Sequence, residues 1–278
     1  MDMAREIAGR KRVTVVLRGG GDLATGVAQK LWHAGFALVI LEKETPLAIR
    51  RTVALSSAMQ EGAYRVEDML GRRISDPDEC QKTWAANEIP LLVDPDCRSL
   101  AVLKPTIVVD AILAKRNLGM HTGLAPVTIA LGPGFRAPQD VDVVIETMRG
   151  HQLGRLILDG EAMANTGVPG EVGGKSSERV VHAPVAGCVR HKRKIGDRVK
   201  RGEILFYLDE TPVFSPLDGT LRGLIAQGMA LPKGMKCADV DPRPEEDVDC
   251  LSISDKARSL GGAVLEACFW LGEKKGVM

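Results

Sequence analysis

The chain has 278 residues, of which 37 are lysine or arginine, 36 are aspartate or glutamate and 45% are hydrophobic. This ordinary globular composition argues against disorder, and a net charge of +1 gives no bulk attraction to nucleic acid or anionic lipid. Only 4% of the residues are aromatic, which argues against a base-stacking surface for single-stranded nucleic acid. The charged N-terminus lacks a signal-peptide core and no apolar run reaches membrane length, so we expect a cytoplasmic protein.

Cysteine and histidine spacing gives no sign of a metal site. The six cysteines are scattered and none forms a Cys-x-x-Cys pair, so we expect reduced, mostly buried thiols and no metal. The five histidines show no metal-ligand spacing either. His121 and His151 lie in polar, glycine-rich surroundings that suit an acid or base, but a surface or packing role is the favoured interpretation.

The first third of the chain predicts a strand, a turn, a helix and a second strand. Apolar β-branched residues indicate a buried strand over Arg12–Leu17. An amphipathic pattern predicts a helix over Leu23–Ala34, which Gly35 ends. Ala37–Leu41 is a second buried strand and leads into Glu42. This order predicts a βαβ unit with a right-handed crossover.

The turn before the helix reads Gly19-x-Gly21-x-x-Ala24 and predicts an anion site. Glycines let the chain reverse tightly, and the turn N–H groups together with the positive end of the helix would grip a phosphate. Glu42 follows about 20 residues later, where a carboxylate would bind ribose hydroxyls. We therefore expect a bound nucleotide or similar cofactor; the alternative is the same sheet without one. The candidate binding residues here are Arg18, Gly19, Gly20, Gly21, Asp22, Leu23, Ala24 and Glu42.

Two charged features modify this prediction. Asp22 lies at the mouth of the helix and would repel a pyrophosphate, so capping the helix is its favoured role, ahead of holding a metal ion or a ligand hydroxyl. Arg18 ends a buried strand at the ligand edge, where its planar fork would bind phosphate or carboxylate. Arg50 and Arg51 form a further basic pair, of which one is best interpreted as surface charge.

The alternation of strands and helices continues to about residue 150 and predicts an open parallel sheet. A short helix or turn is expected at Pro46–Arg51 and helices at Asp76–Asn87 and Cys97–Leu103. The expected strands are Leu91–Val93, Thr106–Val109, Val127–Leu131 and Val141–Thr147. Asp110, Gly132 and Gly134 follow strand ends and are further candidate ligand contacts. Ordinary turn roles are equally strong interpretations for all three.

From Val180 the pattern changes to short strands with evenly spaced glycines. Two half-repeats, His182–Gly187 and Phe214–Gly219, predict a small pseudo-symmetric sandwich of the biotinyl/lipoyl type. The hairpin tip at Leu208–Pro212 has no lysine, so we expect no covalent biotin or lipoate. A last helix is predicted over Asp255–Leu271, where Gly261-Gly262 indicates close contact with another backbone.

The expected fold class is α/β: a Rossmann-like open parallel sheet, followed by a small barrel-sandwich (biotinyl/lipoyl-like) β domain and a C-terminal helix. The expected domains are a Rossmann-like nucleotide-binding domain at 1–150, a glycine-rich connector at 151–179, the β domain at 180–243 and a C-terminal helix at 244–278 that packs back on the body. Ser254 is the expected cap of that helix.

Four segments together resemble the YqeB family: Arg18–Gly26, Ile49–Arg51, Glu146–His151 and Asn165–Gly170. The resemblance covers nearly the whole chain, including Ser254–Gly262. It implies an accessory protein of selenium-dependent molybdenum hydroxylases, with a distant similarity to the XdhC-type proteins that mature xanthine dehydrogenase. It therefore implies a pathway without naming a reaction.

From the resemblance and the glycine turn together we expect a maturation protein that binds a nucleotide or a phosphate-bearing cofactor, either NAD(P) or a molybdopterin-type pterin. The expected partners are the cofactor, a client molybdenum hydroxylase and a second copy of the chain, with no nucleic acid and no membrane. One alternative is an NAD(P)-dependent oxidoreductase working near Asp110 and Gly132–Phe135, against which the lack of an acid–base pair argues. Another is a nucleotide-binding module without chemistry. The sequence leaves the ligand, the client and catalysis itself open.

Overall fold

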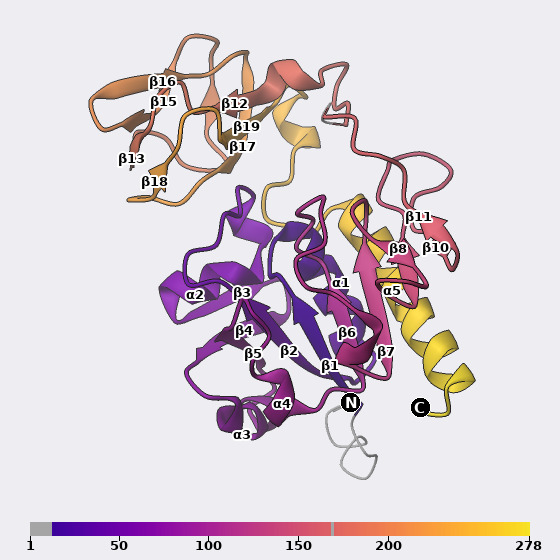
Figure 1. Ribbon diagram of the computed structural model, residues 1–278. Helices are drawn as coiled ribbons and strands as arrows, with labels where there is room; N and C mark the ends of the chain where they lie inside the picture. Colours follow the sequence, from indigo (N-terminus) through magenta and orange to yellow (C-terminus); the bar gives the residue numbers. More distant parts are fainter. Residues whose placement is uncertain (1–12, 168–169) are drawn as a thin grey trace. The chain divides into compact units, whose positions relative to one another are not determined.

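The computed structural model describes residues 13–167 and 170–278. The predicted strand start at Arg12, the N-terminal segment and the Val168-Pro169 part of the fourth motif lie outside these residues. The described chain divides into two compact units, labelled by element in Figure 1. Unit 1 comprises Met1–Pro46, Ala54–Asn165 and Ile253–Met278, and unit 2 comprises Leu47–Val53 and Thr166–Ser252. Unit 2 therefore takes segment 47–53 from the predicted 1–150 domain, and unit 1 includes the predicted C-terminal helix.

Unit 1 is built on one sheet, which has nine strands in the described residues, in the order β10-β9-β7-β6-β1-β2-β5-β4-β3. Its strands are β1 (Thr14–Arg18), β2 (Ala37–Glu42), β3 (Ala63–Val66), β4 (Met69–Ile74), β5 (Ile89–Val93), β6 (Ile107–Asp110), β7 (Val127–Leu131), β9 (Val143–Ile145) and β10 (Leu156–Ile157). A separate pair joins β8 (Arg136–Ala137) to β11 (Gly160–Glu161). The central strands are almost wholly buried because helices and loops cover both faces of the sheet.

The main helices of unit 1 come from opposite ends of the chain. They are α1 (Asp22–His33) and α5 (Asp255–Lys274), which lie side by side in Figure 1 and pack tightly on each other. Shorter helices are α2 (Ala58–Glu61), α3 (Cys80–Ala85) and α4 (Leu100–Leu103). Single 3-10 turns lie at Arg51–Val53, Leu55–Ser57, Pro77–Glu79, Thr122–Leu124, Ser177–Arg179 and Glu245–Asp247. None of the helices in the described chain combines the length and apolar character needed to span a bilayer.

The predicted fold class, a Rossmann-like open parallel sheet followed by a biotinyl/lipoyl-like sandwich, is wrong. The sheet of unit 1 is mixed, since β3 pairs antiparallel with β4 at one edge and β10 pairs antiparallel with β9 at the other. The two residues Glu67 and Asp68 connect β3 to β4, and so short a connection forces an antiparallel hairpin. Unit 1 also includes α5 from the last part of the chain.

Unit 2 contains two antiparallel sheets of four strands each within the described residues. One has the order β12-β19-β17-β14 and the other β16-β15-β13-β18. The strands are β12 (Val180–His182), β13 (Gly187–His191), β14 (Arg198–Val199), β15 (Ile204–Leu208), β16 (Thr211–Phe214), β17 (Gly219–Leu224), β18 (Ala230–Leu231) and β19 (Lys236–Asp241). A common apolar core includes the fully buried Phe206 and Leu221. Segment 47–53 from the first third of the chain belongs to this unit, so it differs from the self-contained sandwich predicted over 180–243.

Candidate functional site

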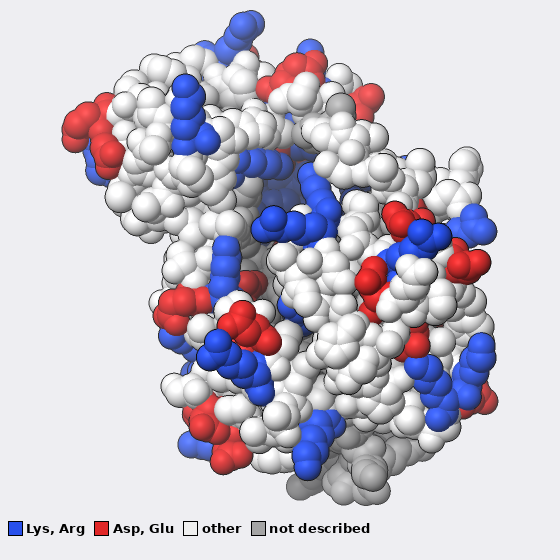
Figure 2. All heavy atoms as spheres, in the orientation of Figure 1, with Lys and Arg blue, Asp and Glu red and all other residues white. Residues whose placement is uncertain are grey.

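The carboxyl edge of the unit 1 sheet gathers the polar residues that the sequence singled out. The parallel strands β1, β2 and β6 end at Arg18, Glu42 and Asp110, and Glu146 directly follows β9. Parallel pairing aligns these ends, so residues more than one hundred positions apart meet at one edge. On the face drawn in Figure 2, acidic and basic side chains are interspersed over unit 1.

Arg18 is committed to a buried ion pair. Its Nη1 donates to Asp110 Oδ2 over 2.9 Å, and its Nη2 donates to the Leu118 carbonyl over 2.7 Å. Both charged side chains are almost fully buried. Burial raises the pKa of Asp110, although Arg18 and the N–H of Ile112 act in the opposite direction. The structure therefore brings the predicted ligand contacts Arg18 and Asp110 together, and the two bind each other.

The backbone N–H groups of Gly19 and Gly20 in the glycine turn also form hydrogen bonds within the protein. The N–H of Gly19 donates to the Leu41 carbonyl over 2.8 Å, and the N–H of Gly20 donates to Glu42 Oε2 over 2.9 Å. The second oxygen of Glu42 accepts the N–H of Lys43 over 2.9 Å. The predicted ribose-binding carboxylate thus holds the turn in place, and the amides of Gly19 and Gly20 do not point toward a guest.

Close packing explains why glycine occupies the first positions of the turn. Gly19 has a φ of +91°, and a Cβ there would lie 3.2 Å from the backbone of Ala111 and Ile112. A Cβ at Gly20 would lie 3.1 Å from the backbone nitrogen of Ser56. A Cβ at Gly21 would meet nothing within 4 Å. The space next to the turn is therefore open at Gly21, where the helix begins.

The N-cap residue of α1 is a glycine and so has no side chain to cap the helix. Gly21 is the N-cap residue, with extended backbone, and Asp22 is already the first helical residue. Asp22 therefore follows the N-cap position, and its role as a cap of the first amides stays a prediction. The N-terminal end of α1, which includes Leu23 and Ala24, keeps its partial positive charge at the carboxyl edge of the sheet.

Lys256 and Arg149 bring positive charge to the same place. Burial lowers the pKa of Lys256, the charge of Arg149 lowers it further, and Asp22, Glu146 and Asp255 act in the opposite direction. Arg149 forms a two-pronged ion pair with Asp255, over 3.0 and 3.2 Å. Lys256 forms no such ion pair within residues 13–167 and 170–278. A half-buried ammonium that senses Asp22, Glu146 and Asp255 but forms no ion pair with them in the described residues is thus the exceptional feature of this edge.

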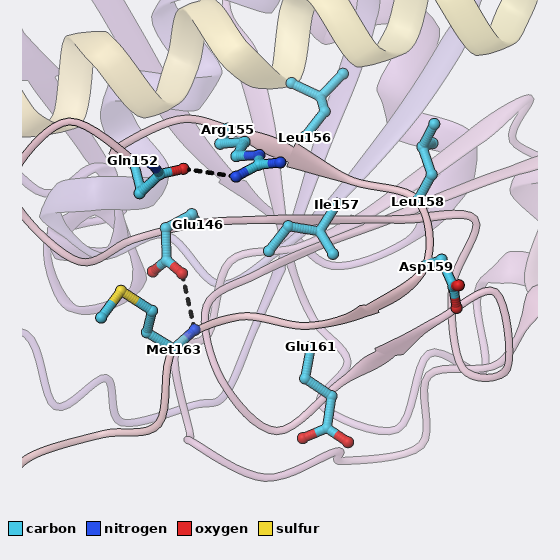
Figure 3. Close-up of a pocket in the computed structure, with 9 residues that line it drawn as sticks. All are labelled: Glu146, Gln152, Arg155, Leu156, Ile157, Leu158, Asp159, Glu161 and Met163. Atoms are coloured by element: carbon cyan, nitrogen blue, oxygen red, sulfur yellow. Dashed lines mark hydrogen bonds between the residues drawn. The ribbon is translucent and has the colours of Figure 1, made fainter.

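Glu146 connects this charged cluster with a cavity. It is 3% exposed, and its two oxygens accept the N–H groups of Met148 and Met163, each over 2.7 Å. The cavity has a volume of about 380 Å³, and Figure 3 shows the side chains around it. Its lining residues are Glu146, Gln152, Arg155, Leu156, Ile157, Leu158, Asp159, Glu161 and Met163. The lining mixes apolar side chains with carboxylates that can accept hydrogen bonds.

Sequence reasoning missed Glu146, Arg149 and Lys256 as site residues. Glu146 and Arg149 lie in Glu146–His151, a segment that carries the family resemblance, and the glycine turn lies in another. Lys256 lies in Ser254–Gly262, which the resemblance covers. Only the packing of α5 beside α1 brings these segments together. The motifs were therefore visible in the sequence, but the sequence did not show that they lie close together in the fold.

Gly132 and Gly134 serve packing. A Cβ at Gly132 would lie 2.8 Å from Thr147 Oγ1, and a Cβ at Gly134 would lie 2.5 Å from the backbone nitrogen of Arg116. The structure therefore explains both glycines without the anion that was one of their two predicted roles. Across the described residues, no group of three or more His, Cys, Asp or Glu side chains is arranged to hold a metal ion.

Comparison with known proteins gives one strong match. Over 257 residues the chain is 49% identical to the uncharacterized protein YqeB of Escherichia coli (strain K12). The match covers 92% of this chain and 47% of that protein, so the chain spans about half the length of the relative. No family model matches the chain.

Solved structures give only weak similarity. A succinylglutamate desuccinylase/aspartoacylase from Rhodobacter sphaeroides aligns with 84% of this chain and 86% of its own, at 12% identity and a TM-score of 0.27. An aspartoacylase family protein from Mesorhizobium loti aligns with 84% and 87%, at 10% identity and a TM-score of 0.27. The ectoine utilization protein EutE (DoeB) from Ruegeria pomeroyi aligns with 82% and 85%, at 14% identity and a TM-score of 0.25. Such low scores support no argument about fold or activity.

The strand pairing also corrects the predicted description. The mixed sheet removes the basis for a Rossmann assignment. The description as a Rossmann-type NAD(P)-binding protein is therefore wrong. The resemblance read from the motifs is confirmed at the level of sequence: over nearly all of its length, the chain is a relative of one part of YqeB.

Proposed function

We propose that the chain is an accessory protein that binds the phosphate or carboxylate of a nucleotide- or pterin-type molecule at Lys256 and the start of α1. The observation that carries the proposal is the half-buried Lys256 ammonium, which lacks an ion pair within the described chain. A buried cation is unfavourable unless a counter-charge compensates it. A bound anion would supply that charge.

The start of α1 supports the same ligand chemistry. The first N–H groups of a helix have no partner inside the helix, and the N-cap residue of α1, Gly21, has no side chain to satisfy them. They point toward the carboxyl edge of the sheet together with the positive end of the helix dipole, as in many anion sites. Asp22, Glu146 and Asp255 oppose an anion here, so they would restrict the site to a ligand that also offers hydrogen-bond donors.

The cavity beside Glu146 would take the uncharged part of such a ligand. Leu156, Ile157 and Met163 line it and would cover the flat face of a heterocycle. Each oxygen of Glu146 accepts one backbone N–H and keeps a second lone pair, which suits the amino and ring N–H groups of a pterin or purine. The volume of about 380 Å³ is in the range of small-molecule sites.

An accessory role fits the interactions of the other polar residues at the carboxyl edge of the sheet. Arg18 and Asp110 are paired with each other, and Glu42 holds the glycine turn. These groups at the edge are therefore already committed, which favours binding over acid–base catalysis. That the client is a selenium-dependent molybdenum hydroxylase rests on the family resemblance alone, and it is part of the proposal.

Thermal denaturation with added ligands tests the proposal. AMP, GTP and a molybdopterin species would be added to the full chain, and a ligand at one hundred times its dissociation constant should stabilise the protein by about 2.7 kcal/mol. Lys256→Met should abolish the effect, whereas Lys256→Arg should retain part of it. Lys274→Met removes an exposed charge near the other end of α5 and is the matched control.

Two outcomes would overturn the proposal. One is the absence of stabilisation by every ligand in the set. The other is equal stabilisation of the wild type and Lys256→Met, because the ligand would then bind elsewhere. Co-purification with a molybdenum hydroxylase, scored by mass spectrometry, tests the client separately from the ligand.

A further inference from the structure

Unit 2 contains an arginine, Arg222, at an irregular position in the strand pairing. Arg222 lies on β17, where the register with β19 shifts between Leu221 and Gly223. It is therefore the extra residue of a bulge, and bulges re-aim side chains and recur next to functional sites. The Arg222 side chain is only 14% exposed, and its Nε has no hydrogen-bond partner in the described part of the chain.

The carboxylates nearest to Arg222 already serve other arginines. Asp241 receives both prongs of Arg243, at 2.9 and 2.7 Å, and lies 3.8 Å from Arg222 Nε, beyond hydrogen-bond range. Asp239 is paired with Arg179. Both aspartates are buried, and each already forms an ion pair with an arginine other than Arg222. Arg222 therefore adds a buried positive charge that the local acids do not fully offset.

Segment 47–53 places a further arginine beside it. The Ile49 carbonyl accepts the N–H of Leu224 over 2.8 Å, and Arg51 Nε donates to the Leu224 carbonyl over 2.7 Å. These contacts fix the intervening Arg50 close enough to repel Arg222, and burial together with this repulsion lowers the pKa of Arg222. The Ile49–Arg51 motif of the sequence is thus held on β17.

We propose that Arg222 and Arg50 form a binding site for a phosphoryl oxyanion in unit 2, separate from the site at Lys256. Guanidinium groups bind phosphate with two parallel hydrogen bonds, and two of them would share a doubly charged group. Asp239 and Asp241 hold Arg179 and Arg243 in place around it. The bulge gives Arg222 its position on β17. The buried positive charge of Arg222, which the local acids do not fully offset, favours an anion there.

Anion titration of the full chain tests the site. Inorganic phosphate, pyrophosphate and citrate would be added at constant ionic strength in a phosphate-free buffer, with chloride as reference, and binding followed by calorimetry. We expect saturable binding of phosphate or pyrophosphate, and citrate shows whether a carboxylate ligand binds the same guanidinium groups. Arg222→Gln should weaken binding at least tenfold. Arg201→Gln, which removes an exposed arginine of the same unit, should not.

Stability without ligand gives a second measurement. Removing a buried charge whose nearest acid, Asp241, already pairs with Arg243 relieves desolvation and the repulsion by Arg50, so Arg222→Gln should raise the Tm of the ligand-free protein while it abolishes the response to phosphate. Lys256→Met should retain the phosphate response of unit 2. The proposal is overturned if the wild type shows no saturable response beyond that to chloride, or if Arg222→Gln responds like Arg201→Gln.

Discussion

Gly26 in α1 and Gly261 in α5 touch backbone to backbone. A Cβ placed on Gly261 would lie 2.3 Å from the carbonyl oxygen of Gly26, and a Cβ on Gly26 would lie 2.4 Å from the carbonyl oxygen of Ala257. No side chain fits at either position, so the two helices approach more closely than side chains normally allow. This contact joins the two ends of the chain and brings Lys256 within electrostatic reach of Asp22.

Alanine substitutions in α5 should separate the effect of this contact from helix propensity. Gly261→Ala should destabilise the protein by about 2–4 kcal/mol, because overpacking forces the helices apart and the obstacle is backbone. Gly262→Ala should be neutral or stabilise by up to about 1 kcal/mol, since a Cβ there meets nothing and alanine favours the helix. Urea denaturation measures both, and equal effects of the two variants would contradict the packing argument.

The local elements of unit 1 were largely predictable because each depends on short-range pattern. The helix predicted over Leu23–Ala34 is observed at Asp22–His33, and the last helix begins at Asp255 as predicted. Ser254 caps it, with its Oγ accepting the N–H of Ala257. The close backbone contact expected at Gly261-Gly262 is confirmed for Gly261 alone, because Gly262 lies on the open side of the helix.

Elements that depend on distant partners were not predictable. The hairpin of β3 and β4 was missed, since charged residues such as Arg65 and Arg72 interrupt its apolar pattern at the sheet edge. The helix predicted over Asp76–Asn87 is shorter, with a 3-10 turn before α3. The residues of the site were not predicted for the same reason, because the position of Lys256 depends on the contact between α1 and α5.

The Arg18–Asp110 ion pair should be far more important to stability than surface pairs are. Asp110→Asn leaves a buried guanidinium without its counter-charge, and we expect a loss of about 3–5 kcal/mol in the free energy of unfolding. The double variant Arg18→Met/Asp110→Asn should recover much of this loss, because the uncompensated charge is removed. The exposed pair of Arg98 and Asp96 is the control, where Asp96→Asn should change stability by less than about 1 kcal/mol. Chemical denaturation of the four proteins checks the prediction, and a small effect of Asp110→Asn contradicts it.

Glu67 should give the stability of unit 1 a dependence on acid pH. Although burial raises its pKa, the hydrogen bonds from the Ile253 N–H, Arg258 and Gln29 together hold the pKa of Glu67 below its usual value of 4.5. A depressed pKa in the folded state means that the stabilisation is full above the unfolded pKa and is lost as the pH falls through the folded one. Glu67→Gln should therefore lower stability by about 1–2 kcal/mol at pH 7. The difference from wild type should shrink steadily below about pH 4.5.

Thermal denaturation between pH 3 and pH 8 measures this difference. Glu266→Gln, at an exposed position on α5, is the control and should leave the Tm nearly unchanged over the whole range. The same pH dependence in Glu67→Gln and wild type would show that the contact of Glu67 with Arg258 does not contribute to acid lability.

The cysteines should differ in reactivity by their burial. Burial raises the pKa of Cys268 and of Cys237 to about 12, and both are 0% exposed, whereas Cys188 is exposed. Because the thiolate is the reactive form, a thiol reagent at pH 8 should modify Cys188 within the first kinetic phase and reach the two buried thiols only through unfolding. Cys188→Ser should remove the fast phase, and denaturant should make the buried thiols react. Mass spectrometry of the modified peptides assigns each phase, and fast labelling of Cys268 in the folded protein would contradict the tight packing of α5 on which the site at Lys256 depends.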